Sequence, residues 1–251
     1  MDKNKYRKKT EKFFDEFAQR RKKNMYIPSK ARDLEFDKFF RFLNLKKGSS
    51  VVELGSGYGK FVLGLLKRGH RVTGVDISKD SNEILLQIAK EKKLDKNLTL
   101  LCSDFSKPPY HNKFDGAYCI STFHLLASKE KDRVKILANL VEAIKENGTI
   151  VLIEPNPLNP FFYPFYLFSD QASWNIEKTF LKSSEKNLRK IFKKLRLENI
   201  EVSYFGFLPI RFINSFYPVY YVNKLVNNLP LVNNLSSFIY IKATKRGPAK
   251  V

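Results

Sequence analysis

The chain has 251 residues, of which 43% are apolar and 28% are charged, and its formal net charge is +21. This length and apolar content are typical of a globular protein with one sizeable core, and they exclude a largely disordered chain. The amino terminus lacks an apolar stretch behind its charges, and no run of about 18 apolar residues occurs. We therefore expect neither a secretory signal nor a spanning helix. The expected location of the protein is the cytoplasm. Cys102 and Cys119 fit no disulfide framework or metal-ligand spacing, which favours a reducing compartment and no metal.

The chain begins with helical patterns and continues with alternating strands and helices. Residues 2–24 are predicted to form an amphipathic helix with Tyr6, Phe13, Phe14 and Phe17 near one stripe, and residues 30–45 a second helix. Strands are expected at 50–54, 71–76, 98–102, 114–120 and 149–154, separated by helices at about 58–68, 81–93 and 129–145, with Ser81 as a helix cap. A helix at 184–195 and strands at 200–205 and 237–243 follow.

This alternation predicts an α/β fold with a doubly wound, seven-stranded, mostly parallel sheet and an amino-terminal helical extension. We expect a single domain over residues 1–251. Residues 1–47 form the extension, residues 48–154 the core, and residues 155–182 and 206–235 two insertions.

A glycine-rich turn follows the first strand of this core, in Val51-Val52-Glu53-Leu54-Gly55-Ser56-Gly57-Tyr58-Gly59. In such sheets a ligand binds beyond the carboxyl ends of the strands, where glycines let the backbone approach it closely. The dinucleotide pattern G-x-G-x-x-G is not met, because Lys60 occupies its last glycine position. The carboxylate of Glu53 suits a cationic ligand, and Asp76 at the end of the second strand could bind both hydroxyls of a ribose.

The ordered set of Glu53, the three glycines, Asp76, Ser103-Asp104-Phe105 and Phe114-Asp115 resembles the class I S-adenosylmethionine-dependent methyltransferases of small-molecule type. The resemblance covers about residues 48–154 and implies a Rossmann-like methyltransferase fold with S-adenosyl-L-methionine as cofactor. It also implies that Phe14-Asp15-Glu16-Phe17-Ala18 belongs to a helical lid, since it is similar to the family's Tyr-Asp-x-x-Ala element. The implied contacts are Glu53, Gly55 and Gly57 around the methionine part, Asp76 at the ribose, Ile77 packed on the adenine, and Asp104 with Phe105 at the adenine edge. Gly59 and Ile120 are further cofactor-binding residues that the resemblance implies.

Two residues are candidates for a general base, which an oxygen acceptor of the methyl group needs. His124 follows the fourth strand, and the ordinary pKa of histidine suits this role. Glu154 ends the fifth strand and could act as a base or anchor the acceptor. The alternatives are a histidine that only shapes the pocket and a solvated turn carboxylate.

The two insertions hold the clues to the acceptor, because both are rich in aromatic residues beside basic ones. Such a mixture suits a small, hydrophobic or lipid-linked acceptor, or the interface of an anionic membrane. The alternative is that the insertions pack together as a small extra core. The aromatic members are Phe161, Phe162, Tyr163, Phe165, Tyr166 and Phe168 in the first insertion, and Phe207, Phe212, Phe216, Tyr217, Tyr220 and Tyr221 in the second.

The net charge favours a polyanionic partner, for which we weigh a membrane surface against nucleic acid. Of the 46 basic residues 34 are Lys and 12 are Arg, and arginine is the residue that base and phosphate recognition prefers. A lysine-rich composition of the kind that an AT-rich genome produces explains the positive charge at least as well as a polyanionic partner does. An RNA methyltransferase is the first alternative function, although no RNA-binding module is recognisable. A non-catalytic cofactor-binding module is the second, and the oligomeric state stays open.

Overall fold

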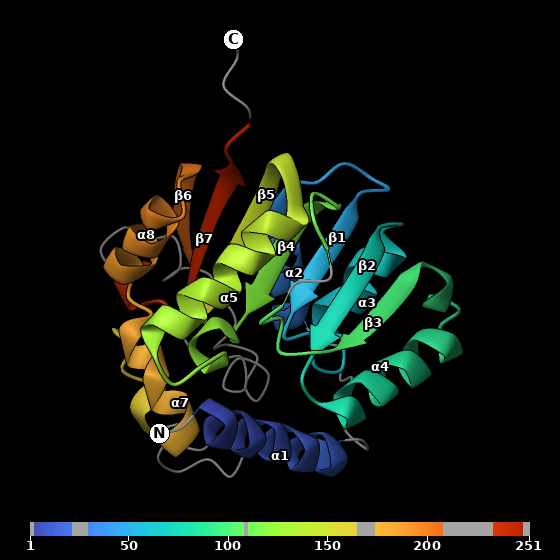
Figure 1. Ribbon diagram of the computed structural model, residues 1–251, viewed down its shortest axis with the longest axis horizontal. Coiled ribbons are helices and arrows are strands. Elements are labelled where there is room, and N and C mark those ends of the chain that lie inside the picture. Colours follow the sequence, from blue (N-terminus) through green and yellow to red (C-terminus); the bar gives the residue numbers. More distant parts are fainter. Residues whose placement is uncertain (1–2, 22–29, 108–109, 165–173, 208–232, 248–251) are drawn as a thin grey trace.

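The computed structural model describes residues 3–21, 30–107, 110–164, 174–207 and 233–247, and its strands form one seven-stranded sheet in the order β3-β2-β1-β4-β5-β7-β6 (Figure 1). β7 pairs antiparallel with both neighbours, whereas the other pairs are parallel, so the predicted mostly parallel sheet is confirmed. The strands are β1 (Ser50–Leu54), β2 (Arg71–Asp76), β3 (Leu98–Cys102), β4 (Phe114–Ile120), β5 (Ile144–Pro155), β6 (Leu197–Phe205) and β7 (Phe238–Lys245).

Helices cover both faces of this sheet, as the alternating pattern predicts. Apolar side chains of α2, α3 and α4 pack together on one face, and those of α5 and α8 pack on the other. The helices of the described residues are α1 (Lys3–Arg21), α2 (Lys30–Leu43), α3 (Lys60–Lys67), α4 (Lys79–Glu91), α5 (Glu130–Ala143), α7 (Trp174–Glu177) and α8 (Glu185–Lys194). Short 3₁₀ segments are η1 (Asp95–Asn97), η2 (Phe123–Leu125), η3 (Lys178–Lys182) and η4 (Asn233–Leu235).

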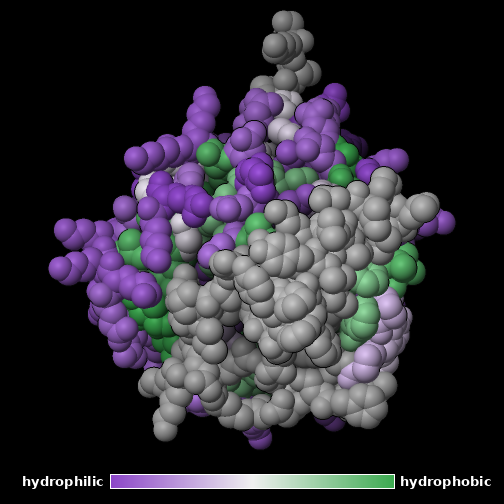
Figure 2. All heavy atoms as spheres, turned by 180° about the vertical axis from the view of Figure 1, so that it is seen from behind, coloured by the Kyte–Doolittle hydropathy of each residue, from purple (hydrophilic) through white to green (hydrophobic). Residues whose placement is uncertain are grey.

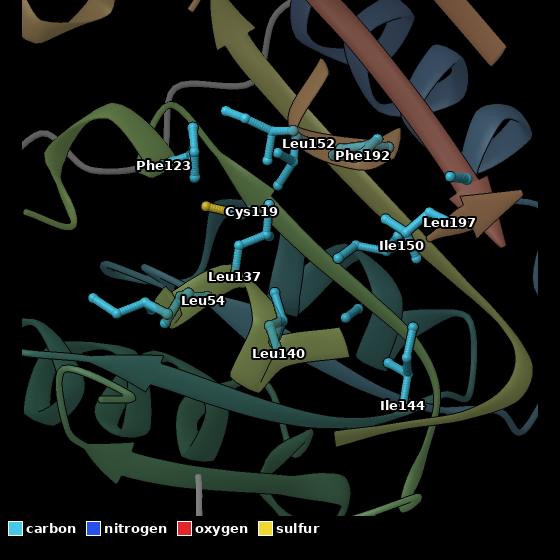
Figure 3. Packing of buried hydrophobic residues seen from close by; sticks show 14 of the residues in the cluster. Leu54, Cys119, Phe123, Leu137, Leu140, Ile144, Ile150, Leu152, Phe192 and Leu197 are labelled. Carbon is cyan, nitrogen blue, oxygen red and sulfur yellow. The ribbon is translucent and has the colours of Figure 1, made fainter. Parts of the chain in front are cut away.

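Successive side chains of each strand point to opposite faces of the sheet, so the core has two halves, one on each face. In β1, Val51 belongs to the cluster under α2 and α3, while Val52 and Leu54 belong to the cluster under α5 and α8. Figure 3 shows this second cluster, in which Leu137 and Leu140 lie near Cys119 and Leu54. Because both faces are buried, the central strands hold the loops at their carboxyl ends in fixed positions.

α1 lies across the carboxyl ends of the parallel strands rather than on a face of the sheet (Figure 1). Its inner stripe includes Tyr6 and Thr10, which are 6% and 3% exposed. The amphipathic pattern of the sequence therefore reflects a helix with one side against the strand ends and the other side in solvent.

Several element boundaries differ from the sequence prediction, for local reasons. Ser78 rather than Ser81 caps α4, since the Ser78 hydroxyl accepts a hydrogen bond from the Ser81 N–H at 3.0 Å. α5 ends at Ala143 rather than near residue 145, and Ile144 already pairs with Phe114 in the sheet. The turn of Asn147 (φ 60°) then lies within β5. β6 begins at Leu197, three residues earlier than predicted.

The described parts of the two aromatic insertions pack against the sheet and against each other. Phe162 and Phe180 are buried, with Trp174 and Phe238 packed around them, and the Phe161 and Phe207 ring centroids lie 5.6 Å apart. This agrees with the small extra core considered as an alternative. The other aromatic candidates, Phe165, Tyr166, Phe168, Phe212, Phe216, Tyr217, Tyr220 and Tyr221, lie outside the described residues.

The surface of the described residues is strongly hydrophilic, as the net charge requires. Figure 2 shows hydrophilic side chains around the back of the molecule, with exposed apolar residues in separate patches between them. Within the described ranges, no helix is both long enough and apolar enough to cross a bilayer.

Candidate active site

A cavity of about 240 Å³ opens at the carboxyl ends of β1, β2 and β4, beneath α1. This is the place where parallel α/β sheets bind ligands. Three parts of the chain build its walls: the inner stripe of α1, the turns after β1, β2 and β3, and the segment that leads from β4 into α5. Its lining is mostly apolar and includes Phe14, Phe17, Leu54, Val75, Ile77, Ile120, Leu125, Leu126 and Ile136.

The glycine-rich turn forms the floor of the cavity next to β1. The N–H groups of Gly55 and Ser56 both donate to the carbonyl of Val75, at 2.7 and 3.1 Å, which ties the turn to β2. Gly55 has a φ of +78°, and a Cβ there would lie 2.2 Å from Cγ2 of Thr122. Gly57 has a φ of +50°, and a Cβ there would meet no atom within 4 Å. Gly55 is therefore needed for packing, whereas Gly57 leaves open space at the cavity.

Asp76 stands at the end of β2 and lines the cavity. Its carboxylate accepts the N–H of Gly57 at 2.8 Å through Oδ2 and the N–H of Ser78 at 2.9 Å through Oδ1. Burial raises the pKa of Asp76, while these two backbone donors lower it. A carboxylate has about four lone-pair sites, so the fixed carboxylate can also accept a hydrogen bond from a hydroxyl group of a ligand.

Asp104 lies on the cavity wall after β3, beside α1, the helix that covers the cavity and is called the lid helix below. Arg7 of α1 donates to its carboxylate at 2.9 Å. Phe105, by contrast, is fully buried in the core and is absent from the cavity wall, and its carbonyl accepts a hydrogen bond from Asn139. The structure thus places Asp104, Ile77 and Ile120 at the predicted cofactor cavity and Phe105 behind it.

Glu53 and Gly59 also lie outside the cavity wall, although both were predicted to contact the cofactor. Glu53 is 3% exposed and accepts a hydrogen bond from the hydroxyl of Tyr118 at 2.8 Å. Burial raises the pKa of Glu53 well above its ordinary value, and Asp76 raises it further. A Cβ on Gly59 would lie 2.1 Å from Cδ1 of Leu85, so this glycine serves the contact between α3 and α4.

His124 and Glu154, the predicted catalytic residues, are brought together, but in a buried cluster. Their side chains are 1% and 0% exposed, and Nδ1 of His124 lies 2.7 Å from Oε2 of Glu154. Nε2 of His124 lies 2.9 Å from Oε2 of Glu177, at the end of α7. Glu154 also accepts the backbone N–H groups of Thr122, Phe123 and His124, at 3.0 to 3.2 Å.

This cluster argues against His124 as a general base. Burial lowers its pKa, but the carboxylates of Glu154 and Glu177 outweigh burial and raise the pKa to about 9. The imidazole is therefore protonated near neutral pH, and each ring nitrogen donates to a carboxylate. A proton acceptor needs a free lone pair and access to the substrate, and His124 has neither, since it is absent from the cavity wall.

The lid helix is docked on the cavity by contacts at both of its ends. The Ser78 hydroxyl donates to Asp15 at 2.5 Å, and the rings of Phe17 and Tyr58 stack with centroids 6.3 Å apart. Near the other end of the helix, Tyr6 lines the cavity. Tyr6 and Thr10 were not predicted as site residues. Their spacing from Phe14 and Phe17, at positions i, i+4, i+8 and i+11, is the signal that could have revealed them.

Comparison with known proteins identifies the kind of domain that contains this cavity. Residues 51–148 match the family model described as a methyltransferase domain. The core is a class I S-adenosylmethionine-dependent methyltransferase domain. The chain is 29% identical over 126 residues to a glycine/sarcosine N-methyltransferase of Parasynechococcus marenigrum, a match that covers 49% of the chain and 44% of that protein. It is also 31% identical over 121 residues to an S-adenosyl-L-methionine-dependent Diels-Alderase of Talaromyces variabilis, over 47% of the chain and 40% of that protein.

The fold of the methyltransferase domain is likewise that of solved relatives. Phosphoethanolamine N-methyltransferase 2 of Haemonchus contortus, in complex with S-adenosyl-L-methionine, superposes with a TM-score of 0.62 at 18% identity. That match covers 89% of this chain and 55% of the solved one. The chain spans less than half the length of the curated relatives it matches.

The residues present fit S-adenosyl-L-methionine as the cofactor of the domain. The carboxylate of Asp76 lines the cavity and is fixed by backbone N–H groups, and Gly57 leaves space beside it. Ile77 and Ile120 supply apolar wall, and Asp104 supplies an acceptor at the far end. Asp76 would hold the ribose, and Ile77 and Asp104 would hold the adenine.

Proposed function

We propose that the protein is an enzyme that transfers a methyl group from S-adenosyl-L-methionine to a small, hydrophobic or lipid-linked acceptor. The observation that carries this proposal is the cavity between Gly57, Asp76 and the lid helix, with its mostly apolar walls. A mostly apolar cavity under a lid excludes water from a displacement reaction and favours an acceptor with apolar surface.

The chemistry that the cofactor supplies is an activated methyl group, so the protein residues act by binding and orientation. Asp76 fixes one end of the cofactor cavity, and the turn at Gly55 fixes its floor. Thr122 and Ser121 line the cavity where β4 ends, and the cluster of Glu154 and His124 holds their backbone in place. His124 does not line this cavity, which favours an acceptor atom that is nucleophilic without a histidine base.

Calorimetric titration with S-adenosyl-L-methionine tests the cofactor part of the proposal. We expect Asp76→Ala to weaken binding at least tenfold, because the ribose hydroxyls lose a charged acceptor. Glu83→Ala is the matched control, since Glu83 lies on nearby α4 with a side chain that is 64% exposed and paired with Lys79 at 3.6 Å. Equal affinity for Asp76→Ala and the parent protein would refute this site. Transfer of a tritiated methyl group to fractionated lipid and small-metabolite pools then tests the acceptor class.

An anionic membrane surface is the partner that we propose alongside this activity. Its support is the exposed side of α1, which carries Lys5, Lys8, Lys9 and Lys12 at helical spacing above the cavity. Each lysine near an anionic bilayer contributes about 1 kcal/mol of attraction. Docking through this helix would bring the cavity entrance close to a lipid-linked acceptor.

Flotation with vesicles that contain an anionic lipid tests this partner. Changing Lys5, Lys8, Lys9 and Lys12 to Gln should abolish flotation at low salt, whereas the same change at Lys186, Lys190, Lys193 and Lys194 on α8 controls for net charge. Equal loss in both variants would indicate only a charge effect, and no flotation of the parent protein would refute the membrane proposal. Retention of labelled RNA by the parent protein would instead favour the RNA alternative.

A further inference from the structure

Four of the five large apolar side chains that are exposed among the described residues gather at one end of the molecule. They are Leu158, Tyr163, Leu181 and Leu235, with exposed fractions of 39 to 62%, and together we call them the apolar edge. The fifth, Leu86, lies on α4. A single exposed leucine is ordinary on a protein surface, whereas several in one place indicate contact with a partner.

A buried asparagine joins two members of the apolar edge that are far apart in the sequence. Asn159 follows Leu158 in the turn after β5, and its side-chain amide donates to the carbonyl of Leu235 at 2.6 Å. β5 and β7 meet at the same place, because Pro155 pairs with Phe238. Leu158 and Leu235 therefore lie beside the carboxyl end of β5, on neighbouring stretches of chain.

The other two members lie against the same turn. The Tyr163 hydroxyl donates to the carbonyl of Pro157 at 3.0 Å, and the Tyr163 ring centroid lies 6.2 Å from that of Phe180. Leu181 is the next residue of η3, and it is exposed whereas Phe180 is buried. These contacts hold the segments that carry the apolar edge together at one surface.

The apolar edge lies at the same end of the molecule as α1. The side chain of Tyr6 on α1 interacts with Thr179 of η3, and Figure 1 shows α7 next to the amino-terminal part of α1. The cavity opens at this end, beneath α1. A partner bound to the apolar edge would therefore lie near the cavity and near the exposed lysines of α1.

The exposed charges beside the apolar edge are positive. Residues 155–164 and 233–239 contain no charged side chain, although 28% of the chain is charged. Lys178 and Lys182 flank Leu181 and are exposed. The two carboxylates of the same stretch are bonded to other side chains, Glu177 to His124 and Glu185 to Arg189 and Tyr204. The surface is therefore apolar in its middle and cationic at its rim.

We propose that the apolar edge inserts into the interface of an anionic bilayer. This inference rests on the membrane partner of the proposed function and names the surface that enters the lipid. Lysine is depleted in protein–protein interfaces, whereas anionic headgroups attract it. Apolar side chains with a lysine rim therefore fit a bilayer better than a second protein. Insertion here would hold the cavity at the level of the headgroups, within reach of a lipid-linked acceptor.

Flotation with vesicles of phosphatidylcholine that contain about one quarter phosphatidylglycerol tests this surface. The double variant Leu158→Gln/Leu235→Gln removes two apolar side chains without a change of charge. We expect it to weaken vesicle binding at least about tenfold, because the burial of their apolar area in the lipid is lost. Leu86→Gln is the matched control, since Leu86 is an exposed leucine on α4, and it should bind vesicles as the parent protein does.

Tryptophan fluorescence reports the insertion itself. Leu158→Trp places a fluorophore in the apolar edge, and Leu86→Trp places one on α4. The chain has a single tryptophan, Trp174, whose signal in the parent protein is subtracted. Brominated phosphatidylcholine quenches a tryptophan that enters the acyl region, so the added fluorescence of Leu158→Trp should be quenched and that of Leu86→Trp should not.

The outcomes separate this inference from the proposed function. If the double variant floats as well as the parent protein, or if Leu158→Trp is not quenched, the apolar edge is not the inserted surface, while the membrane partner stands. If the parent protein does not float, this inference and the membrane partner both fail, and calorimetry with S-adenosyl-L-methionine still decides the enzymatic part. Self-association of the parent protein in sedimentation, without flotation and abolished in the double variant, would assign the edge to a contact between two copies and overturn the inference.

Discussion

The imidazole of His124 and the carboxylate of Glu154 form a buried pair, with Nδ1 and Oε2 2.7 Å apart, where β4 and β5 end. Glu177 contacts the other ring nitrogen at 2.9 Å, so one histidine joins the strand ends to α7. Glu154 in turn accepts the backbone N–H groups at the start of η2. The pair therefore determines the course of the chain from Ser121 to Leu125, and three residues of this segment, Ser121, Thr122 and Leu125, line the cavity.

The raised pKa of His124 predicts a pH dependence of stability. Its pKa is about 9 in the folded protein and 6.5 in the unfolded reference. A group with a raised folded pKa stabilises fully below its unfolded pKa, and this contribution disappears as the pH rises through the folded pKa. We expect the free energy of unfolding to fall by up to about 3 kcal/mol between pH 6.5 and 9.

Proton NMR of the imidazole rings checks this prediction directly, since the chain has 3 histidines. The His124 resonance should titrate above pH 8, and urea unfolding should show the loss of stability over the same window. His111→Gln should leave the slope unchanged, because His111 is exposed in the loop before β4. Titration of His124 near 6.5, or a flat stability profile, would contradict the proposed charge state.

The glycine turn offers a test that separates backbone strain from ligand contact. Gly57 and Gly48 both have positive φ angles, +50° and +84°, and a Cβ at either meets no atom within 4 Å. Alanine at either position should cost about 1 kcal/mol of stability because it disfavours this backbone region. Only Gly57→Ala should weaken the binding of S-adenosyl-L-methionine in calorimetry, since only Gly57 lines the cavity. Equal affinities in the two variants would mean that the cofactor does not approach Gly57.

The hydrogen bond between Tyr118 and Glu53 predicts a stability effect without a direct cofactor contact. The Tyr118 hydroxyl donates to Glu53 at 2.8 Å, and burial raises the pKa of Glu53 well above its ordinary value. Tyr118→Phe leaves a buried carboxyl group without this donor, so we expect a loss of about 2 kcal/mol in urea unfolding. Tyr163→Phe, at an exposed site, should change stability by less than about 0.5 kcal/mol. A neutral result for Tyr118→Phe would show that Glu53 finds another partner.

The sheet could be predicted from the sequence because its strands are short apolar runs between clear turn signals. The first and last residues of β1, β2, β3 and β4 agree with the expected ones. Each of these strands ends at, or within two residues of, a residue that was predicted to bind the cofactor. The start of β5 was missed because Asn147-Gly148 signals a helix end and a turn. In the structure, Ile144 pairs with Phe114 and Thr149 with Gly116, so residues 145–148 form that turn as an irregularity within β5.

The place of Gly55, Gly57 and Asp76 on the cavity wall was also predictable, since these residues end or follow strands whose ends are fixed by the fold. Glu53 could not be placed in this way. Strand alternation puts its side chain on a face of the sheet, where Tyr118 satisfies it, and only the packing of α2 and α3 shows that this face is closed. The role of His124 depends on Glu177, which comes from a segment 53 residues away in the sequence. No local pattern reveals that pairing.

The docking of the lid helix supplies the last prediction. The Ser78 hydroxyl donates to Asp15 at 2.5 Å while it accepts the N–H of Ser81 at 3.0 Å, so α4 keeps its cap when Asp15 is removed. Asp15→Ala should therefore loosen α1 without unfolding the core. We expect amide hydrogen exchange in residues 3–21 to become about tenfold faster, as loss of a hydrogen bond to a charged group implies.

Glu16→Ala is the matched control for this variant, because Glu16 is the next residue of the helix and its side chain is 57% exposed. Its pair with Lys12, at 3.9 Å, is of the kind that contributes little in water, so exchange should stay within about twofold of the parent protein. Mass spectrometry of peptides from α1 and α4 distinguishes the outcomes. Faster exchange in both helices would mean that Asp15 stabilises the cap of α4 as well. Unchanged exchange in α1 would show that its other contacts, among them Arg7 with Asp104, Gln19 with Asp80 and Phe17 with Tyr58, hold the helix without Asp15.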